Sequence, residues 1–317
     1  MMFATRGIVV SFSVFVIVYC VLSVGVELLW CGIRLRIEKH PARQIADWLF
    51  ALRVLPLLTA AAVTLAVAVP SFVLLEPRAI DEPIGAIPLA LALCGAALGI
   101  FGLLNAGLAL RKARRAISAW TIHAEPVQTA APVRVLRIAP AVPAMTATGI
   151  ARSTVLLSHA AESVLTAPEL RTALNHEVAH VRRRDNLKKL LLRFVAFPGM
   201  DKLEAAWLEA TEMAADDAAV SDAAEALDLA AALIKLSRLT PGEGSVDLTA
   251  ALVHGSVSDV NARVERLISW RAERQVTGRK WSPFYGLTAA LTTLAIFAFT
   301  YSQLLVQVHQ ATEWLVR

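Results

Sequence analysis

The chain has 317 residues, of which 56% are hydrophobic and 18% are charged, and its mean hydropathy is +0.57. This composition is too apolar for a single soluble domain and indicates a membrane protein. The net charge of +5 comes from basic residues that flank the apolar runs. The sequence contains no basic patch interleaved with aromatic residues, so we do not expect direct binding of nucleic acid.

Four apolar runs are long enough to cross a bilayer. They cover about residues 8–30, 54–75, 84–110 and 284–306. The first run is longer than the apolar core of a signal peptide, lacks a small-residue cleavage site and is followed by Arg34 and Arg36, so we expect an uncleaved span. Arg53 lies near the start of the second run, and we expect its side chain to extend to the cytoplasmic face.

The positions of lysine and arginine predict how these spans are oriented. Basic residues follow the first and third spans and precede the fourth, whereas the 76–83 loop between the second and third is net acidic. Under the positive-inside rule the N-terminus lies outside and the basic segments lie in the cytoplasm. The sequence therefore predicts three spans within residues 1–110, a cytoplasmic domain at 111–282, and a fourth span with a short external tail at 283–317.

The first part of this cytoplasmic domain contains predicted strands. Residues 132–140 and 153–158 are β-branched and apolar, and proline or glycine bounds them. The second stretch is expected to be either an exposed edge strand or an ordinary buried strand.

A His-Glu-x-x-His pattern follows at residues 176–180, inside a predicted helix. The helix begins with a capping box at 166–169, and apolar residues recur behind it at helical spacing. Residues four apart share a helix face, so His176 and His180 can offer two imidazole nitrogens to one metal ion, with Glu177 beside them. The pattern arises by chance in about one protein in a hundred of this length, and the alternative is a surface helix with two polar histidines.

A second predicted helix, at 207–220, can complete the site. A catalytic zinc needs a third protein ligand, which Glu212 can supply. Asp216, one turn further on, can accept the outer N–H of a ligating histidine. An acidic, alanine-rich helix is by itself more often a solvated face, but its combination with the first motif favours a zinc site.

These two motifs resemble a known family. Residues 176–186 and 212–218 resemble those of the BlaR/MecR-type membrane metallopeptidases, gluzincin antirepressors related to the HtpX and CAAX-prenyl membrane proteases. Residues 149–158 are similar to the strand before that family's motif helix, and residues 260–268 to its Arg-Ile-x-x-Leu helix, so the resemblance covers about residues 110–310. It implies a multi-pass α-helical protein of the bacterial inner (cytoplasmic) membrane with a cytoplasmic α+β gluzincin-type zinc metallopeptidase domain.

The predicted mechanism is peptide hydrolysis. Zinc held by His176, His180 and Glu212 would acidify a water, and Glu177 would take its proton and deliver it to the leaving amine. The oxyanion needs a further donor. His254 is a candidate, because HtpX-like proteases have a histidine shortly before the corresponding helix, although here the separation is longer and a loop histidine without a role is the alternative.

The strand predicted at 153–158 is a candidate substrate site. If it is an exposed edge beside the zinc helix, it could bind an extended peptide by adding a strand to the sheet. The residues concerned are Val155, Leu156, Leu157 and Ser158.

The resemblance also implies a role in signal-dependent proteolysis, by self-cleavage or by inactivation of a cytoplasmic repressor. The expected partners are such a protein substrate, membrane lipid and a separate sensor protein. Residues 307–317 contain no penicillin-binding domain and no Ser-x-x-Lys motif, so we do not expect direct sensing of β-lactams. The alternatives are a non-catalytic membrane signalling or scaffold protein that keeps the fold, and an HtpX-like quality-control protease.

Overall fold

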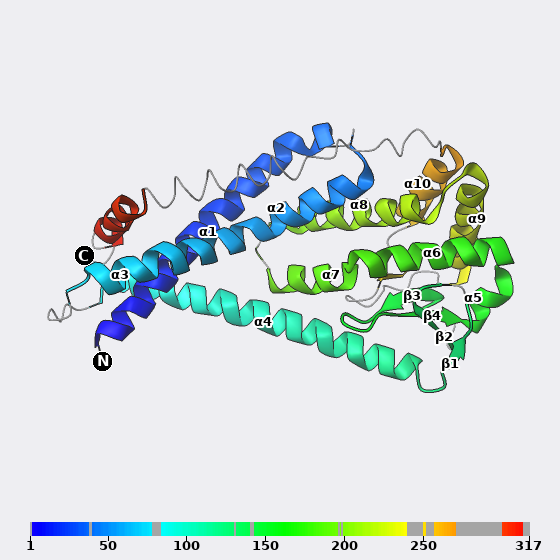
Figure 1. Cartoon of the computed structure of the whole chain (residues 1–317), viewed down its shortest axis with the longest axis horizontal. Coiled ribbons are helices and arrows are strands. Elements are labelled where there is room, and N and C mark those ends of the chain that lie inside the picture. Colours follow the sequence, from blue (N-terminus) through cyan, green and yellow to red (C-terminus); the bar gives the residue numbers. More distant parts are fainter. Residues whose placement is uncertain are drawn as a thin grey trace.

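The computed structural model describes most of the chain. The residues described are 2–37, 40–77, 84–129, 131–139, 143–195, 197, 199–239, 250–251, 257–270 and 300–312. Within them the molecule is mostly helical, and a small mixed sheet lies at one end (Figure 1).

Among the residues described, three helices are long and apolar enough to cross a membrane, at Phe3–Trp30, Ala42–Leu75 and Ala86–Trp120. Large apolar side chains remain exposed along them, as expected of surfaces that face lipid. Together with the sheet, these helices agree with the coarse prediction of a membrane protein that carries a soluble domain. Of the fourth predicted span, residues 284–299 lie outside the described residues.

The three helices form a crossed bundle. They comprise α1 (Met2–Ile37), the continuous α2 (Ala42–Val63), π-helical η1 (Thr64–Ala68) and α3 (Val69–Leu75), and α4 (Ala86–Trp120). Ser13 of α1 donates a hydrogen bond to the carbonyl of Pro88, 2.9 Å away at the start of α4. A Cβ at Gly95 would lie 2.7 Å from Val16 Cγ2, so glycine is needed where α4 approaches α1.

The π-helical stretch has a local cause. Pro70 has no N–H to donate to the carbonyl of Ala66, four residues earlier. The Tyr301 hydroxyl donates to this carbonyl instead, at 2.8 Å, and Ser71 donates to the Leu305 carbonyl at 3.0 Å. These bonds attach the helical residues 300–312 to η1 and α3 (Figure 1).

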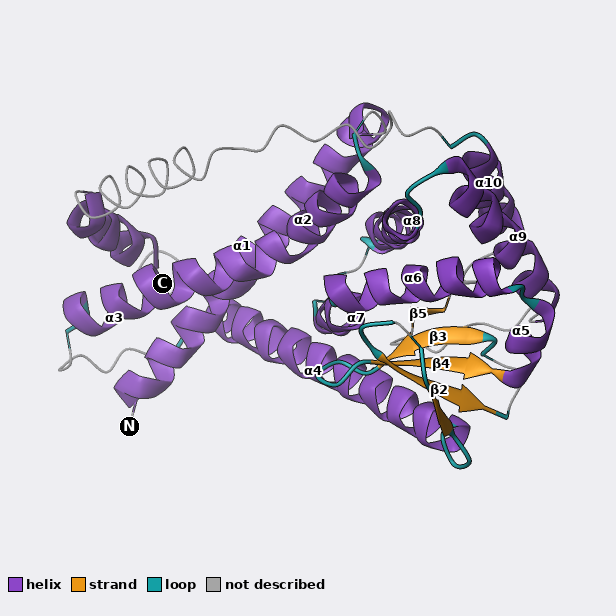
Figure 2. Cartoon of the chain, turned by 45° about the vertical axis from the view of Figure 1, so that its right-hand side comes forward, coloured by secondary structure: helices purple, strands orange, loops and turns teal. Residues whose placement is uncertain are grey.

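The soluble part is built on a sheet with the strand order β1-β2-β4-β3-β5 (Figure 2). Strands β2 and β4 are parallel, and the other neighbours are antiparallel. The strands are β1 (Glu125–Val127), β2 (Arg134–Ile138), β3 (Met145–Thr148), β4 (Thr154–Ser158) and β5 (Ala250–Ala251).

Strand β4 corrects one expectation. It pairs with β2 on one side and β3 on the other, and its residues Val155 to Ser158 are fully buried. The prediction of an exposed edge strand is therefore wrong, and the alternative of a buried strand holds. The uninterrupted apolar run Val155 to Leu157 fits a strand covered on both faces, but such a run does not specify its neighbours.

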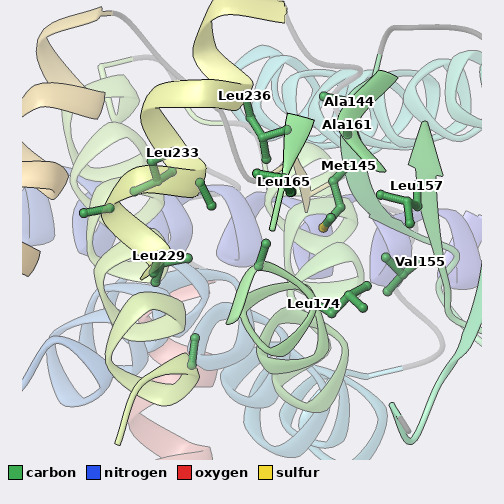
Figure 3. Close-up of a cluster of buried hydrophobic side chains, with 14 of the residues drawn as sticks. Ala144, Met145, Val155, Leu157, Ala161, Leu165, Leu174, Leu229, Leu233 and Leu236 are labelled. Carbon is green, nitrogen blue, oxygen red and sulfur yellow. The ribbon is translucent and has the colours of Figure 1, made fainter. Parts of the chain in front are cut away.

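The helices of the soluble part are α5 (His159–Val164), α6 (Ala167–Arg183), α7 (Asp185–Phe194), α8 (Asp201–Ala219), α9 (Ala223–Leu239) and α10 (Val257–Ile268). Helix α6 lies over one face of the sheet (Figure 2). The core lies between the sheet, α6 and α9 (Figure 3). Leu229, Leu233 and Leu236 follow the helical period of α9, and each fully buried leucine contributes about 1.5–3 kcal/mol.

A second apolar cluster joins the soluble part to the long helices. Leu192 of α7 and Trp207 of α8 pack in one cluster with Trp30 of α1 and Leu49 of α2. Arg53 of α2 is only 4% exposed and is hydrogen-bonded to Tyr19 of α1. Its side chain is therefore buried, whereas the sequence predicted that it would extend to the cytoplasmic face.

Candidate metal centre

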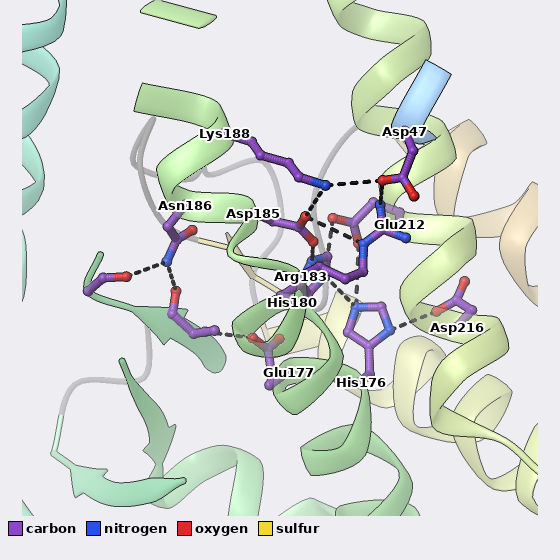
Figure 4. Close-up of polar contacts among 12 residues, drawn as sticks. Asp47, His176, Glu177, His180, Arg183, Asp185, Asn186, Lys188, Glu212 and Asp216 are labelled. Atoms are coloured by element: carbon purple, nitrogen blue, oxygen red, sulfur yellow. Dashed lines mark hydrogen bonds and ion pairs between the residues drawn. The ribbon is translucent and has the colours of Figure 1, made fainter. Parts of the chain in front are cut away.

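Three buried side chains converge between α6 and α8 (Figure 4). His176 and His180, one turn apart on α6, place their Nε2 atoms 3.1 Å apart. The Glu212 oxygens enter from α8, 3.5 Å from His176 Nε2 and 3.6 Å from His180 Nε2. Ligand atoms of a tetrahedral site with bonds of about 2.1 Å are about 3.4 Å apart, so this group could hold one metal ion.

The outer nitrogen of each histidine faces a carboxylate. His176 Nδ1 lies 2.9 Å from Asp216, the residue predicted for this position, and His180 Nδ1 lies 2.8 Å from Asp185. A carboxylate at Nδ1 keeps the proton there and leaves the Nε2 lone pair for a cation. Both imidazoles are therefore oriented for ligation.

Asp185 reaches His180 because the chain turns sharply between the two helices. Arg184 adopts a left-handed conformation, with φ 55° and ψ 40°, and ends α6. Helix α7 begins at the next residue and carries Asp185 back beneath the imidazole. The sequence pattern assigns no role to Asp185, because nothing local predicts a left-handed arginine.

Arg263 of α10 joins the two acidic residues of α8. Its Nε and Nη2 donate to the Asp216 carboxylate at 2.8 and 2.6 Å, and its Nη1 lies 3.1 Å from Glu212 Oε2. The side chain is 4% exposed. Arg263 thus fixes both the third ligand and the partner of His176, a role that the local sequence does not reveal.

Four carboxylates and two cations are buried around the centre, at Glu177, Asp185, Glu212, Asp216, Lys189 and Arg263. Arg183 and Lys188 also face Asp185, with Nε and Nζ 3.5 and 4.0 Å from its Oδ1, so cations of the chain compensate this carboxylate. Lys189 is a further residue that the pattern missed: burial lowers its pKa, against the opposing influence of the carboxylates of Glu212, Asp185 and Glu177.

The pKa values reflect the same network. Burial by itself would lower the pKa of His176, but its contacts with Asp216 and Glu212 outweigh burial and raise that pKa to about 9. Burial would raise the pKa values of Glu212 and Asp216, but His180, His176 and Arg263 hold the pKa of Glu212 well below its usual range, and Arg263 and His176 do the same for Asp216. The third ligand is therefore an anion at neutral pH.

Glu177 is buried beside the ligands. Its Oε2 accepts a hydrogen bond of 2.5 Å from the backbone N–H of Ala147 on β3. Its Oε1 has no hydrogen-bond partner among the residues described. Burial raises the pKa of Glu177, which the nearby histidines oppose. A buried, unpartnered oxygen of this kind suits a base that receives a proton from a water at the centre.

Strand β3, rather than β4, lies next to Glu177. The Asn186 amide donates to the carbonyls of Ala147 and Gly149 at 3.1 and 3.2 Å, which holds β3 against α7. On the other side of β3, residues 250–251 of β5 pair with Thr146 and Ala147. The strand beside the centre is therefore already paired with residues of the same chain. His254, the predicted oxyanion donor, lies outside the described residues.

A cavity of about 500 Å³ reaches the centre from the side of α8. Glu212 and Arg263 form its inner wall, and Trp30 of α1 lines it as well. The metal-binding group is thus accessible from the region where the soluble part meets the long helices.

Comparison with known proteins gives no match, either to a family model or to a curated protein.

Proposed function

We propose that this protein is a zinc-dependent endopeptidase of the membrane. The observation that carries the proposal is the convergence of His176, His180 and Glu212 beside Glu177, whose buried Oε1 has no hydrogen-bond partner in the described part of the chain. Two imidazoles and one carboxylate with a fourth position left for water form a typical catalytic zinc set. The carboxylates at both Nδ1 atoms also favour a catalytic metal centre.

His176, His180 and Glu212 would hold the zinc ion, which when bound polarises a carbonyl and lowers the pKa of a water. Glu177 takes the proton of that water as it attacks the peptide carbonyl, and then delivers the proton to the leaving amine. Ala147 keeps the Glu177 carboxylate in place through its backbone N–H. Asp216, Asp185 and Arg263 orient the ligands.

The proposed substrate is a protein segment in extended conformation on the cytoplasmic side. Such a segment would pair with β3, the strand beside Glu177, and would have to replace residues 250–251 there. Because residues 250–251 of the same chain already pair with β3, self-cleavage is one proposed activity. A cytoplasmic repressor is the other proposed substrate. The cytoplasmic location rests on the positive-inside rule.

The test uses full-length protein purified in detergent, with zinc content and cleavage both measured. In Glu177→Gln we expect about one bound zinc per chain and a cleavage rate lower by a factor on the order of 10²–10⁴, because the base is lost and the ligands remain. In Glu212→Ala we expect loss of zinc. Glu265→Gln, an exposed glutamate on α10 that does not line the cavity leading to the centre, is the matched control and should behave as wild type.

Full activity of Glu177→Gln would refute this mechanism, and wild-type protein without zinc would refute the metal assignment. If wild type and Glu177→Gln both hold zinc and neither is cut, self-cleavage is excluded. A repressor added in trans then separates a protease from a non-catalytic signalling protein.

A further inference from the structure

A second cavity, of about 590 Å³, lies where α2 and α4 meet the α7–α8 connection. At this point the exposed surface of α4 changes from apolar to basic. Leu103 and Leu104 are exposed, and beyond Leu110 the exposed residues are Arg111 and Lys112. This change marks the boundary between the apolar and polar zones of a bilayer. The cavity shares none of its lining residues with the metal-binding group.

Arg53 lines this cavity and is 4% exposed. Its Nε and Nη1 have no hydrogen-bond partner within the described residues, although Tyr19 is hydrogen-bonded to the same side chain. Leaving guanidinium N–H groups buried without acceptors is unfavourable, so this arrangement favours an acceptor supplied by a bound ligand.

The other polar residues of the cavity leave an excess of positive charge. Lys112 and Arg193 add two cations, while Asp201 and Glu204 add two carboxylates. Glu204 is engaged by Arg193, with 3.4 Å between its Oε1 and Nη2. With Arg53 included, three cations face two carboxylates, which matches a ligand with one negative charge.

Apart from the uncharged amide of Asn105, the remaining walls are apolar. Phe101 and Leu108 of α4 line the cavity and are 53% and 54% exposed, so they continue its surface toward the outside of the helix bundle. Phe197 closes the inner side by packing edge-on against Tyr19 of α1, with ring centroids 5.5 Å apart. The cavity is thus cationic within and apolar toward the exposed face of α4.

We propose that this cavity is a binding site for an anionic phospholipid. The phosphate oxygens accept hydrogen bonds from Arg53 and pair with Lys112, and an acyl chain lies along Phe101 and Leu108. A guanidinium is well suited to this task because its planar N–H groups match phosphate oxygens. The site does not depend on the proposed peptidase activity.

The test compares lipid binding to full-length variants in a neutral detergent by native mass spectrometry, with phosphatidylglycerol as the probe. Lys112→Gln removes one charge–phosphate contact from an exposed side chain, and we expect about tenfold weaker binding. Arg111→Gln removes the neighbouring charge, which does not line the cavity, and should bind as wild type. Arg53→Met should abolish binding of the first lipid without lowering the melting temperature in lipid-free detergent.

Two further probes distinguish the source of the phosphate. Phosphatidylcholine has no net charge, and inorganic phosphate has no acyl chain. We expect the first to bind at least tenfold more weakly than phosphatidylglycerol, and the second not to compete at millimolar concentration.

Equal binding of phosphatidylglycerol to wild type, Lys112→Gln and Arg111→Gln would mean nonspecific lipid contact and would overturn the proposal. Competition by inorganic phosphate alone would assign the cavity to a soluble anion. Absence of phosphatidylglycerol binding to wild type would leave water as the acceptor for Arg53, and would also overturn it.

Discussion

At the scale of single residues, the candidate centre depends on side chains that act through the ligands. Asp185 and Asp216 fix the two imidazoles, and Arg263 fixes Asp216 and Glu212 together. A carboxylate behind a ligating histidine also raises its basicity. The affinity of the centre for zinc should therefore be sensitive to residues that do not touch the metal.

Asp185→Asn tests this dependence. The amide keeps the size of the side chain but removes the charge behind His180, so we expect zinc affinity to fall by about 10- to 100-fold. The measurement is zinc competition with a chelator of known affinity. Asp47→Asn is the matched control, because Asp47 shares the partners Lys188 and Arg183 with Asp185 but makes no contact with a histidine. An equal loss of affinity in both variants would attribute the effect to the surface ion pairs.

At the scale of elements, the start of α6 is stabilised by a capping box. Glu169 Oε2 accepts from the Thr166 N–H at 2.7 Å, and the Lys235 ammonium on α9 donates to both oxygens of the Glu169 carboxylate at 2.8 and 2.7 Å. The capping box expected from the sequence is thus confirmed, and the contact with Lys235 adds a link between the two helices of the core.

This contact makes stability depend on pH. Burial would raise the pKa of Glu169, but the hydrogen bonds with Lys235 and Thr166 outweigh it and lower that pKa below its usual value. Because the folded-state pKa is the lower one, the stabilisation is fully present above the unfolded value of about 4.3 and is lost as pH falls through the folded value. We expect Glu169→Gln to cost about 1 kcal/mol at pH 7.

The measurement is the melting temperature of wild type and Glu169→Gln at pH 7 and at pH 3. The difference between the two proteins should shrink toward zero at the lower pH. A difference that is the same at both pH values would show that the charge of Glu169 does not contribute.

At the scale of the whole molecule, the soluble part and the long helices share one packed interface. Gly102 of α4 lies against the end of α7, where an added Cβ would be 2.4 Å from the Phe194 carbonyl oxygen. This clash is with backbone and cannot be relieved by a rotamer change. The C-terminal end of α7 can thus approach α4 only because residue 102 has no side chain.

Gly102→Ala should therefore destabilise the protein by about 1–3 kcal/mol, although alanine is the better helix former. The measurement is the melting temperature in detergent. Gly99→Ala and Gly107→Ala are matched controls on the same helix, since nothing lies within 4 Å of a Cβ at either position. If all three variants melt alike, the contact between α4 and α7 does not contribute to stability.

Several features followed from the sequence because they depend only on local order. Apolar runs long enough to cross a bilayer predict long helices, and the described residues contain three of them. Helical periodicity alone puts His176 and His180 on one face, whatever the rest of the fold. Glu212 was predicted as their partner not from local order but from the chemistry of a catalytic zinc, which needs a third protein ligand.

The tertiary structure alone decided the environment of these residues. Strand β4 is interior because its partners come from residues 134–138 and 145–148, and strand order is not encoded in the apolar pattern of one strand. Arg263 reaches α8 from 47 residues away, and Asp185 depends on a left-handed turn. Arg53 is buried because other helices cover it, which a hydropathy pattern along one helix does not specify. Local periodicity fixes which face a side chain occupies, whereas only packing determines what that face meets.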